Sequence, residues 1–310
     1  MVIGESPWKD VYRRAVWGPW RWMLERSPPA WEYRASRALG AAVGHAAAAK
    51  RAQVRTNLER AFPGRADLDV IAHQTFSAHF ANQYASFSFG RITDGNWGKY
   101  LRFEGLDRLY RSRGTGGGVV LLHPHMGPAQ LPLCVLGAMG LPMHQIGGGA
   151  VNVEKSVVGA WASSTRTQLE GRLPATVHDG KGFLRGVLRA LSGGAIVLTA
   201  CDGTGGGQEL GRRLERVVLG QRMRVPVGAF YLAWRSGVPV HTLYTVADPE
   251  CPARHLSVIG GAVPVVRGGT LDEALESGAD FTAEWLTLVL GRYPGEWHFW
   301  DQFQRGGILA

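Results

Sequence analysis

Two histidines directly follow a short apolar run in the first half of the chain. Val119–Leu122 is typical of a buried strand, because it is short, aliphatic and preceded by the turn residues Gly116–Gly118. His123 and His125 come next. In open α/β sheets ligands bind beyond the carboxyl ends of the strands, so imidazoles at this point are placed for proton transfer. The same residues would equally serve as loop histidines that hydrogen-bond to the backbone.

Composition indicates a folded protein with an acidic partner. The 310 residues are 45% hydrophobic and 19% charged, with a formal net charge of +9. Such a positive excess suits an anionic membrane surface, phosphate-bearing substrates or nucleic acid. Cys134, Cys201 and Cys251 are far apart and form no CxxC pair, which argues against a zinc site or a disulfide framework. We therefore expect a protein of the reducing cytoplasm that needs no metal.

Tryptophans and arginines interleave across residues 7–37. This pairing suits the headgroup layer of a membrane, although helices that pack their tryptophans on the core would show it too. Pro19, Pro28 and Pro29 are expected to divide the region into short helices. We find no run of 18 apolar residues and no signal-peptide centre, so any membrane contact would be peripheral. Nothing else in the chain resembles a nucleic-acid module, and we expect no nucleic-acid partner.

Short apolar strands alternate with helical segments between about residues 116 and 260. The pattern predicts an α/β fold with a central, mostly parallel sheet flanked by helices and preceded by an N-terminal helical segment. We expect one domain over residues 1–310, in which 1–64 form the helical, membrane-surface segment and 65–310 the α/β core. The expected strands are 119–122, 143–146, 175–178, 195–200, 239–246 and 256–259, with a short strand segment at 101–106 and a short strand and loop at 217–220. The expected helices are 34–62, 68–87, 106–111, 131–140, 150–170, 182–191, 227–235 and 280–290.

Three glycine triplets do not make a nucleotide-binding loop. None fits GxxxxGK[ST], and Gly116–Gly118 precedes its strand instead of following it. Gly147–Gly149 and Gly205–Gly207 are predicted to be flexible edges of a pocket.

Six pieces in a fixed order give the chain a family resemblance. The pieces are Asn57–Pro63, His125 with Gln130 five residues later, Arg166 before Gly171, Asp202–Gly203, Gly220 with Val225–Val240, and Pro294–Trp297. With these pieces the chain resembles the bacterial lipid A biosynthesis acyltransferases, within the lysophospholipid acyltransferase superfamily.

The resemblance implies acyl transfer from a carrier-protein or coenzyme A thioester to a hydroxyl or amine, with no other cofactor. His125 matches the family's general base, which suits imidazole because it exchanges protons near neutral pH. Arg166 would stabilise the oxyanion or hold a phosphate or carboxylate. Asp202 matches a later acidic position that orients a partner. The resemblance further places substrate at four positions, which are His123, Gly127, Gly203 and Gly220.

One position departs from the family pattern. The family has Glu or Asp where this chain has Gln130, and a glutamine can fix the imidazole tautomer but brings no negative charge. Three possibilities follow. Gln130 orients His125 for an easier acceptor such as an amine, Asp202 or Glu154 supplies the charge instead, or the protein has kept the fold and left acyl transfer. Pro128 and Ala129 indicate an altered acceptor side.

The sequence is compatible with several functions. The aromatic and basic N-terminus favours a membrane glycolipid or lysophospholipid acceptor on the inner face of the cell membrane, and the missing acid favours a specialised-metabolite acceptor. A catalytically altered member would act as a binding protein or perform a different reaction. His123 is a second candidate base, and Cys201 is either a nucleophile or inert packing. An arginine group would receive an acidic carrier protein or simply be solvated, and it comprises Arg212, Arg213, Arg216, Arg222 and Arg224.

Overall fold

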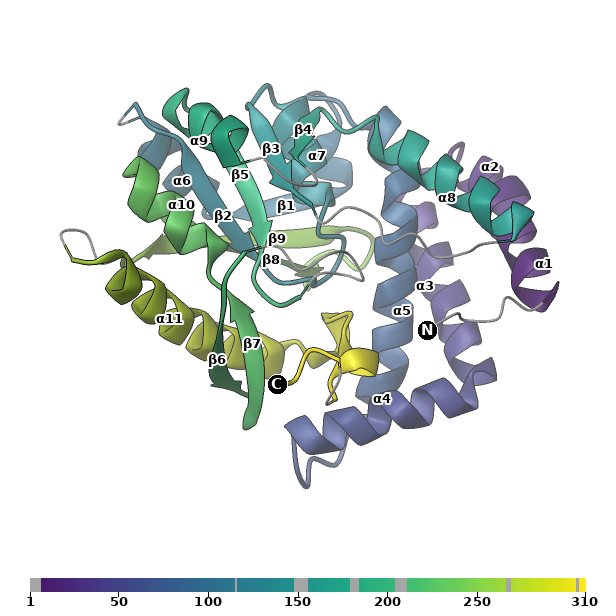
Figure 1. Cartoon of the computed structure of the whole chain (residues 1–310). Helices are drawn as coiled ribbons and strands as arrows, with labels where there is room; N and C mark the ends of the chain where they lie inside the picture. The colour runs from purple at the N-terminus through teal and green to yellow at the C-terminus, as the bar shows by residue number, and fades with distance from the viewer. Residues whose placement is uncertain are drawn as a thin grey trace.

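A seven-stranded sheet forms the centre of the computed structural model (Figure 1). The structure describes residues 7–114, 116–147, 156–178, 184–203, 211–265, 269–304 and 307–310. The strand order is β1-β9-β8-β2-β5-β3-β4, and all neighbours are parallel except β8 and β9. The strands are β1 (Leu101–Glu104), β2 (Val119–His123), β3 (Met143–Ile146), β4 (Ala175–His178), β5 (Ile196–Ala200), β8 (Val240–Ala247) and β9 (His255–Val263). The predicted α/β class and mostly parallel sheet are confirmed.

Helices cover both faces of this sheet, which explains why its central strands are continuously apolar. Along β2, Val120 and Leu122 belong to one buried cluster, whereas Val119 and Leu121 belong to another on the opposite face. The first cluster packs under α9 (Leu184–Ser192), α10 (Gly228–Ser236) and α11 (Leu271–Arg292), and the second under α6 (Leu106–Arg113) and α7 (Leu131–Ala138). The sheet is thus the middle layer of three, and its strand ends are free to carry a site.

A two-stranded antiparallel ribbon projects beside α11 (Figure 1). It consists of β6 (Arg213–Val218) and β7 (Gln221–Pro226), joined through Leu219 and Gly220, both with positive φ. Sequence reasoning placed only a short strand and loop here. The missed signal is the alternation along β7, where Arg222 and Arg224 are exposed and Met223 and Val225 are buried.

Helices of the N-terminal third form a second wall, on the right in Figure 1. The expected helix at 34–62 is two helices that meet at Ala47, and the segment around Pro19 stays helical as a π-turn instead of breaking. α8 lies against α1 and η2, so that residues far apart in sequence share one face. The elements are α1 (Pro7–Ala15), η1 (Val16–Trp20), α2 (Arg21–Leu24), α3 (Pro29–Ala46), α4 (Ala48–Ala61), α5 (Leu68–Ala85), η2 (Ser86–Arg91), η3 (Trp97–Lys99) and α8 (Val157–Glu170).

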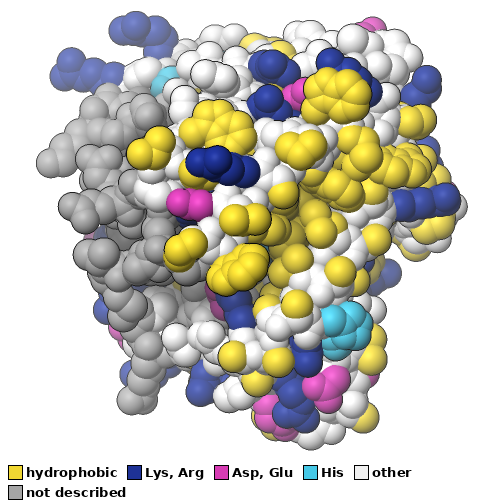
Figure 2. Space-filling view, turned by 90° about the vertical axis from the view of Figure 1, so that its right-hand side faces the viewer, with side chains coloured by type: hydrophobic (Ala, Val, Ile, Leu, Met, Phe, Trp, Pro, Cys, Tyr) yellow, Lys and Arg dark blue, Asp and Glu magenta, His cyan; other side chains and the backbone are white. Residues whose placement is uncertain are grey.

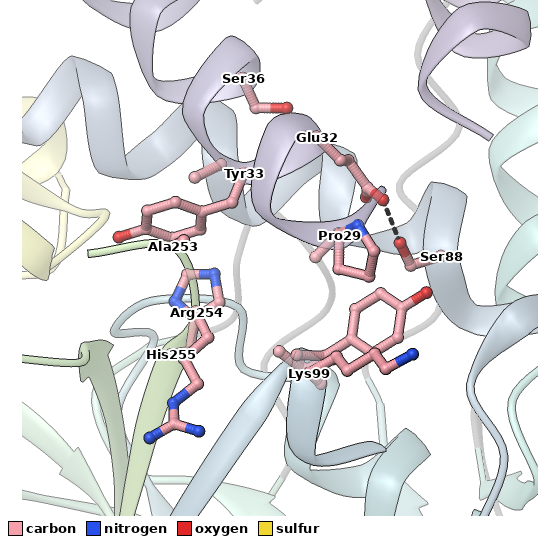
Figure 3. A pocket seen from close by; sticks show the side chains of 13 residues that line it. Pro29, Glu32, Tyr33, Ser36, Ser88, Lys99, Ala253, Arg254 and His255 are labelled. Carbon is pink, nitrogen blue, oxygen red and sulfur yellow. Dashed lines mark hydrogen bonds between the residues drawn. The ribbon is translucent and has the colours of Figure 1, made fainter. Parts of the chain in front are cut away.

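A buried carboxyl group marks the junction between α3 and the core (Figure 3). Glu32 accepts hydrogen bonds from Ser88 and Arg91, both on η2. Burial raises the pKa of Glu32 to about 7, although both of these partners act in the opposite direction. His255 and Ser36 border the same small cavity, and each has a ring or hydroxyl atom without a hydrogen-bond partner. This junction is therefore polar and sensitive to protonation.

Among the described helices, none combines the length and the apolar character that a membrane crossing requires.

Candidate active site

The register of the parallel sheet brings His125 and Asp202 together. β2 and β5 are neighbours, and His123 is paired with Ala200. Two residues beyond this pair, the backbone after β2 reaches His125 and the backbone after β5 reaches Asp202. Parallel strands end at the same edge of a sheet, so these two side chains meet at the carboxyl edge where ligands bind. The backbone N–H of His125 donates to Asp202 Oδ2 at 2.7 Å.

The imidazole of His125 is hydrogen-bonded to the same carboxylate. His125 Nδ1 lies 2.7 Å from Asp202 Oδ1. Burial alone would raise the pKa of the fully buried Asp202, but the nearby His125 and three hydrogen bonds hold that pKa below its ordinary value. The group is therefore an ionised acceptor at neutral pH, so Nδ1 must be the donor. Nε2 of His125 is left with its lone pair, which is the arrangement of a general base.

The C-terminal segment completes the support of this pair. Trp297 Nε1 donates to Asp202 Oδ2 at 2.7 Å, and the backbone of Trp297 bridges that of Met126 in antiparallel fashion. Gly127 N donates to Glu296 O, and His298 N donates to His125 O, both at 3.1 Å. In the sequence Trp297 belongs to the Pro294–Trp297 phrase of the family resemblance, which predicts no role for it. No local pattern could have found this contact, because the partners are 95 residues apart.

Gln130 does not contact His125 Nδ1. It stands directly before α7, and its amide Nε2 lies 3.3 Å from Oε1 of Gln145 on β3. This contact differs from the one expected if Gln130 orients the imidazole, because the side chain points from the start of α7 toward β3. Of the three possibilities left by the sequence, the contacts match the one in which Asp202 supplies the charge. Glu154 lies outside the described residues.

His123 is a less suitable base than His125. It is buried, and its Nδ1 donates to the carbonyl of Pro124 at 3.0 Å, whereas His125 has a carboxylate partner. Burial lowers the pKa of His123 to about 4. Its ring centre lies 5.6 Å from that of His125, and it lines the same cavity. His123 is therefore placed as a neutral wall residue beside the pair.

A cavity of about 900 Å³ opens in front of His125. This volume falls in the range of pockets that bind substrates or cofactors. Its polar wall contains His125, Gln130, Gln145, Arg166, Arg212 and His298. Its apolar wall contains Ile146, Val177, Leu184, Tyr231, Leu232 and Leu275. The site thus joins the candidate base His125 to a large cavity with many apolar lining residues.

Arg166 borders this cavity from α8. Its Nε lies 2.8 Å from Glu170 Oε1 one turn later, and its side chain is 55% exposed. An exposed, paired guanidinium is poorly placed to stabilise charge at a buried reaction centre. Arg166 suits the second predicted role, contact with a phosphate or carboxylate at the cavity rim.

The predicted glycines fall in different places. Gly203 and Gly147 line the cavity. Gly127 has φ +53°, and a Cβ there would lie 2.6 Å from the carbonyl of Thr245, so it serves close backbone packing. Gly220 lies in the turn between β6 and β7 and is not among the residues that line the described cavity wall. Gly148, Gly149 and Gly205–Gly207 lie outside the described residues.

Cys201 packs inside the core. It is fully buried and belongs to the same apolar cluster as β2. Burial raises the pKa of its thiol well above the ordinary value, so the thiolate needed for nucleophilic attack is disfavoured. The packing interpretation fits this environment.

The family is decided by a match along most of the chain. The model of the bacterial lipid A biosynthesis acyltransferase family matches residues 15–254. The chain belongs to this family. No curated protein matches the sequence.

Membership of the lipid A acyltransferase family identifies the protein as an acyltransferase. The matched residues include His125, Arg166 and Asp202. They exclude the C-terminal segment that supports the pair, with Trp297 and His298. The structure thus adds to the site two residues that the family match does not cover.

Proposed function

We propose that this acyltransferase moves an acyl group from a carrier-protein or coenzyme A thioester to a hydroxyl or amine, with His125 as the general base. The observation that carries the proposal is the His125–Asp202 pair facing a cavity of about 900 Å³ with an apolar wall. An acyl chain has the apolar surface for that wall, and only the reacting carbonyl needs to approach His125.

The pair supports a balanced two-step transfer. His125 Nε2 takes the proton of the acceptor hydroxyl or amine as that atom forms a bond to the thioester carbonyl carbon, and the carbonyl π pair moves to oxygen. Asp202 stabilises the imidazolium that results. The oxyanion then collapses, the C–S bond breaks, and the leaving thiolate takes the proton from the imidazolium. Atoms and charge balance without any metal or redox group.

Basic residues at the cavity support a donor that carries phosphate. Arg166, Arg212 and Arg213 line it. Because these three arginines lie at the cavity, we assign them to the donor's phosphates. Arg212 also pairs with Asp272 at 2.5 Å, and Arg216 pairs with Glu276 and Asp280. We assign the exposed Arg222 and Arg224 to an acidic carrier protein.

An exposed aromatic surface supports a lipid acceptor. We define the aromatic face by residues of α1, α2, α3 and α8, which are Trp8, Val11, Trp22, Trp31, Val157 and Trp161. Figure 2 shows hydrophobic side chains gathered on this side of the molecule, with Lys and Arg around them. Trp8 is 81% exposed, and such a surface suits the boundary between headgroups and acyl chains. We propose a peripheral position on the inner face of the cell membrane and a glycolipid or lysophospholipid acceptor.

The specialised-metabolite acceptor and the binding-protein alternative lose their main argument. Both rested on the missing acid at Gln130, and a buried carboxylate contacts His125 in its place. They remain outcomes of the test below.

Product analysis with a panel of donors and acceptors tests the proposal. Purified protein is incubated with acyl-CoA and acyl-carrier thioesters, with and without lysophospholipid, glycolipid or amine acceptors. We expect acceptor-dependent thioester loss that disappears in His125→Ala and persists in His144→Ala, a histidine outside the cavity wall. Thioester binding without turnover in the wild type would favour a binding protein. Acylation of amines alone would favour the specialised-metabolite class.

Vesicle co-sedimentation tests the membrane position. We expect Trp8→Ala with Trp22→Ala to weaken binding to anionic vesicles about tenfold or more, because the burial of two indole rings is lost. Tyr110→Ala is the matched control, since Tyr110 is an exposed aromatic residue on α6. Equal sedimentation of the three proteins would contradict the membrane position and leave the acyl-transfer test untouched.

A further inference from the structure

His298 stands beside His125 on the same side of two paired chain segments. Met126 and Trp297 form an antiparallel bridge, and His298 N donates to His125 O at 3.1 Å. Residues directly opposite each other in an antiparallel pair project their side chains to the same side. Both imidazoles line the cavity. The fold therefore sets a second ring next to the base.

A neighbouring amide fixes the tautomer of His298. Its Nδ1 lies 2.8 Å from Nδ2 of Asn82 on α5. Nδ2 is an amide NH₂ group and can only donate, so Nδ1 of His298 must accept. The ring hydrogen consequently sits on Nε2. Asn82 thus positions an N–H donor on the far side of the ring.

This N–H group is buried and unused. Nε2 of His298 is shielded from solvent and has no hydrogen-bond partner. Native structures rarely keep a buried donor unpaired, and those that do often hold it for a ligand or a reaction. Nε2 is covered by its neighbours, so a ligand atom reaches it only when side chains move apart as substrate enters, as is common on binding.

The ring stays neutral. Burial lowers the pKa of His298 well below its usual value, and the nearby imidazoles of His79 and His125 add to this. A neutral imidazole with its hydrogen on Nε2 donates a hydrogen bond and does not compete with His125 for a proton.

We propose that His298 Nε2–H donates to the acyl carbonyl oxygen of the bound thioester and stabilises the oxyanion that forms there. This rests on the proposed acyl transfer at His125. As the acceptor attacks, the carbonyl π pair moves to oxygen, and the hydrogen bond to Nε2 strengthens without proton transfer. A hydrogen-bond donor directed at the oxygen where negative charge develops is a large source of transition-state stabilisation. Arg166, the donor that the sequence indicated, is exposed and paired with Glu170.

Two amide substitutions distinguish the effect of losing the N–H donor from the effect of losing the imidazole ring. The side chain of His298→Asn retains a group near Nδ1 but has no atom at the place of Nε2, whereas that of His298→Gln reaches it with an NH₂. We expect His298→Asn to lower kcat about 10²–10³-fold with a change of less than about threefold in KM for the donor, and His298→Gln to stay within about tenfold. The control is His255→Asn, which removes another buried imidazole with an unpartnered nitrogen outside this cavity.

Isotope-edited infrared spectroscopy tests the contact independently of turnover. A thioester with a ¹³C-labelled carbonyl is bound to His125→Ala and to His125→Ala with His298→Asn. We expect the carbonyl band of the first complex at lower wavenumber than in water, and the shift to be lost in the second. An unchanged band with bound thioester, a kcat of His298→Asn within fivefold of the wild type, or a loss confined to KM for the acceptor would each overturn the proposal. If the wild type consumes no thioester, the proposed function fails, and the band shift still decides the contact.

Discussion

Replacement of Asp202 by asparagine is the sharpest test of the site, because the hydrogen bonds around this side chain are unequal. Two donors, the backbone N–H of His125 and Nε1 of Trp297, point to Oδ2, and one, His125 Nδ1, points to Oδ1. In Asp202→Asn the amide oxygen must take the place of Oδ2, since an NH₂ group there would face two donors. The new NH₂ then faces His125 Nδ1 and turns it into an acceptor. The ring hydrogen moves to Nε2, and the base is lost.

The expected magnitude follows from this change of tautomer. The same substitution in the triad of a serine protease, where the carboxylate also fixes the tautomer, lowers kcat by about 10⁴. A factor of about 10⁴ corresponds to about 5.4 kcal/mol of activation free energy. We expect a comparable loss for Asp202→Asn, because Asp202 is fully buried and is the carboxylate that contacts His125 Nδ1. Raising the pH should not restore activity, since the fault lies in the position of a hydrogen and not in a titration.

Single-turnover acyl transfer from a saturating thioester is the assay, with thermal unfolding as the check on folding. Asp248→Asn is the matched control, because Asp248 is another fully buried carboxylate, held by Arg102 and Arg254 away from the cavity. It should lose stability and keep kcat. A folded Asp202→Asn protein that retains more than a tenth of wild-type kcat would refute the assignment of Asp202 as the partner of His125.

Three further outcomes are expected. Gln130→Glu should leave kcat within about threefold of wild type in the same assay, because residue 130 contacts Gln145 and not His125 Nδ1. A gain above tenfold would mean that His125 in the wild type lacks sufficient negative charge from its partner. Trp297→Phe should lower the free energy of unfolding in urea by about 1.5–3 kcal/mol, the contribution of a hydrogen bond to a charged group; an unchanged midpoint would show that Nε1 contributes nothing. Glu32 has a raised pKa of about 7 in the folded protein, so folding favours its neutral form. The stability of the wild type relative to Glu32→Gln should therefore fall as the pH rises from about 4.5 to about 7. The expected decrease is on the order of 3 kcal/mol. Denaturation at a series of pH values measures this difference, and a flat difference would contradict the raised pKa.

The comparison of wild type with Glu32→Gln is needed because several histidines have the opposite effect on the pH dependence of stability. Burial lowers the pKa of His79 and His123 to about 4 and that of His255 to about 3. These rings are neutral when folded, so the stability they contribute is present above the unfolded pKa near 6.5 and is lost as pH falls. Comparison of wild type with Glu32→Gln cancels these contributions and isolates the carboxyl group.

Much of the fold could be predicted because its signals are local. The strand at Val119–Leu122 shows as a short apolar run after a glycine turn. The structure confirms it, together with the strands expected at Met143–Ile146 and Ala175–His178. The boundary at Ala47 was missed, because alanine favours helix on both sides of it. The start of α11 was placed near Asp280, although Thr270 and Glu273 form a capping box that the sequence displays.

The site was predicted only in part, for a physical reason. His125, Arg166 and Asp202 were candidates, but sequence left Gln130, Asp202 and Glu154 as alternative partners of the imidazole. Spacing favoured Gln130, which is five residues away. Its position at the start of α7 points it to Gln145. Proximity along the chain could not choose between these partners, because the direction of the Gln130 side chain depends on the geometry at the start of α7.

The sequence by itself determined the element types, the layered α/β class, the family and the identity of the candidate base. These depend on periodicity and on short phrases, which act within a few residues. Only the tertiary structure decided that Asp202 meets His125, because that contact requires β2 and β5 to be parallel neighbours in register across 77 residues. It also decided that the C-terminal segment closes the site, where Trp297 holds the carboxylate and His298 presents its unused N–H. Hydrogen bonds are directional and short, so such a site exists only after the sheet has fixed the positions of its strand ends.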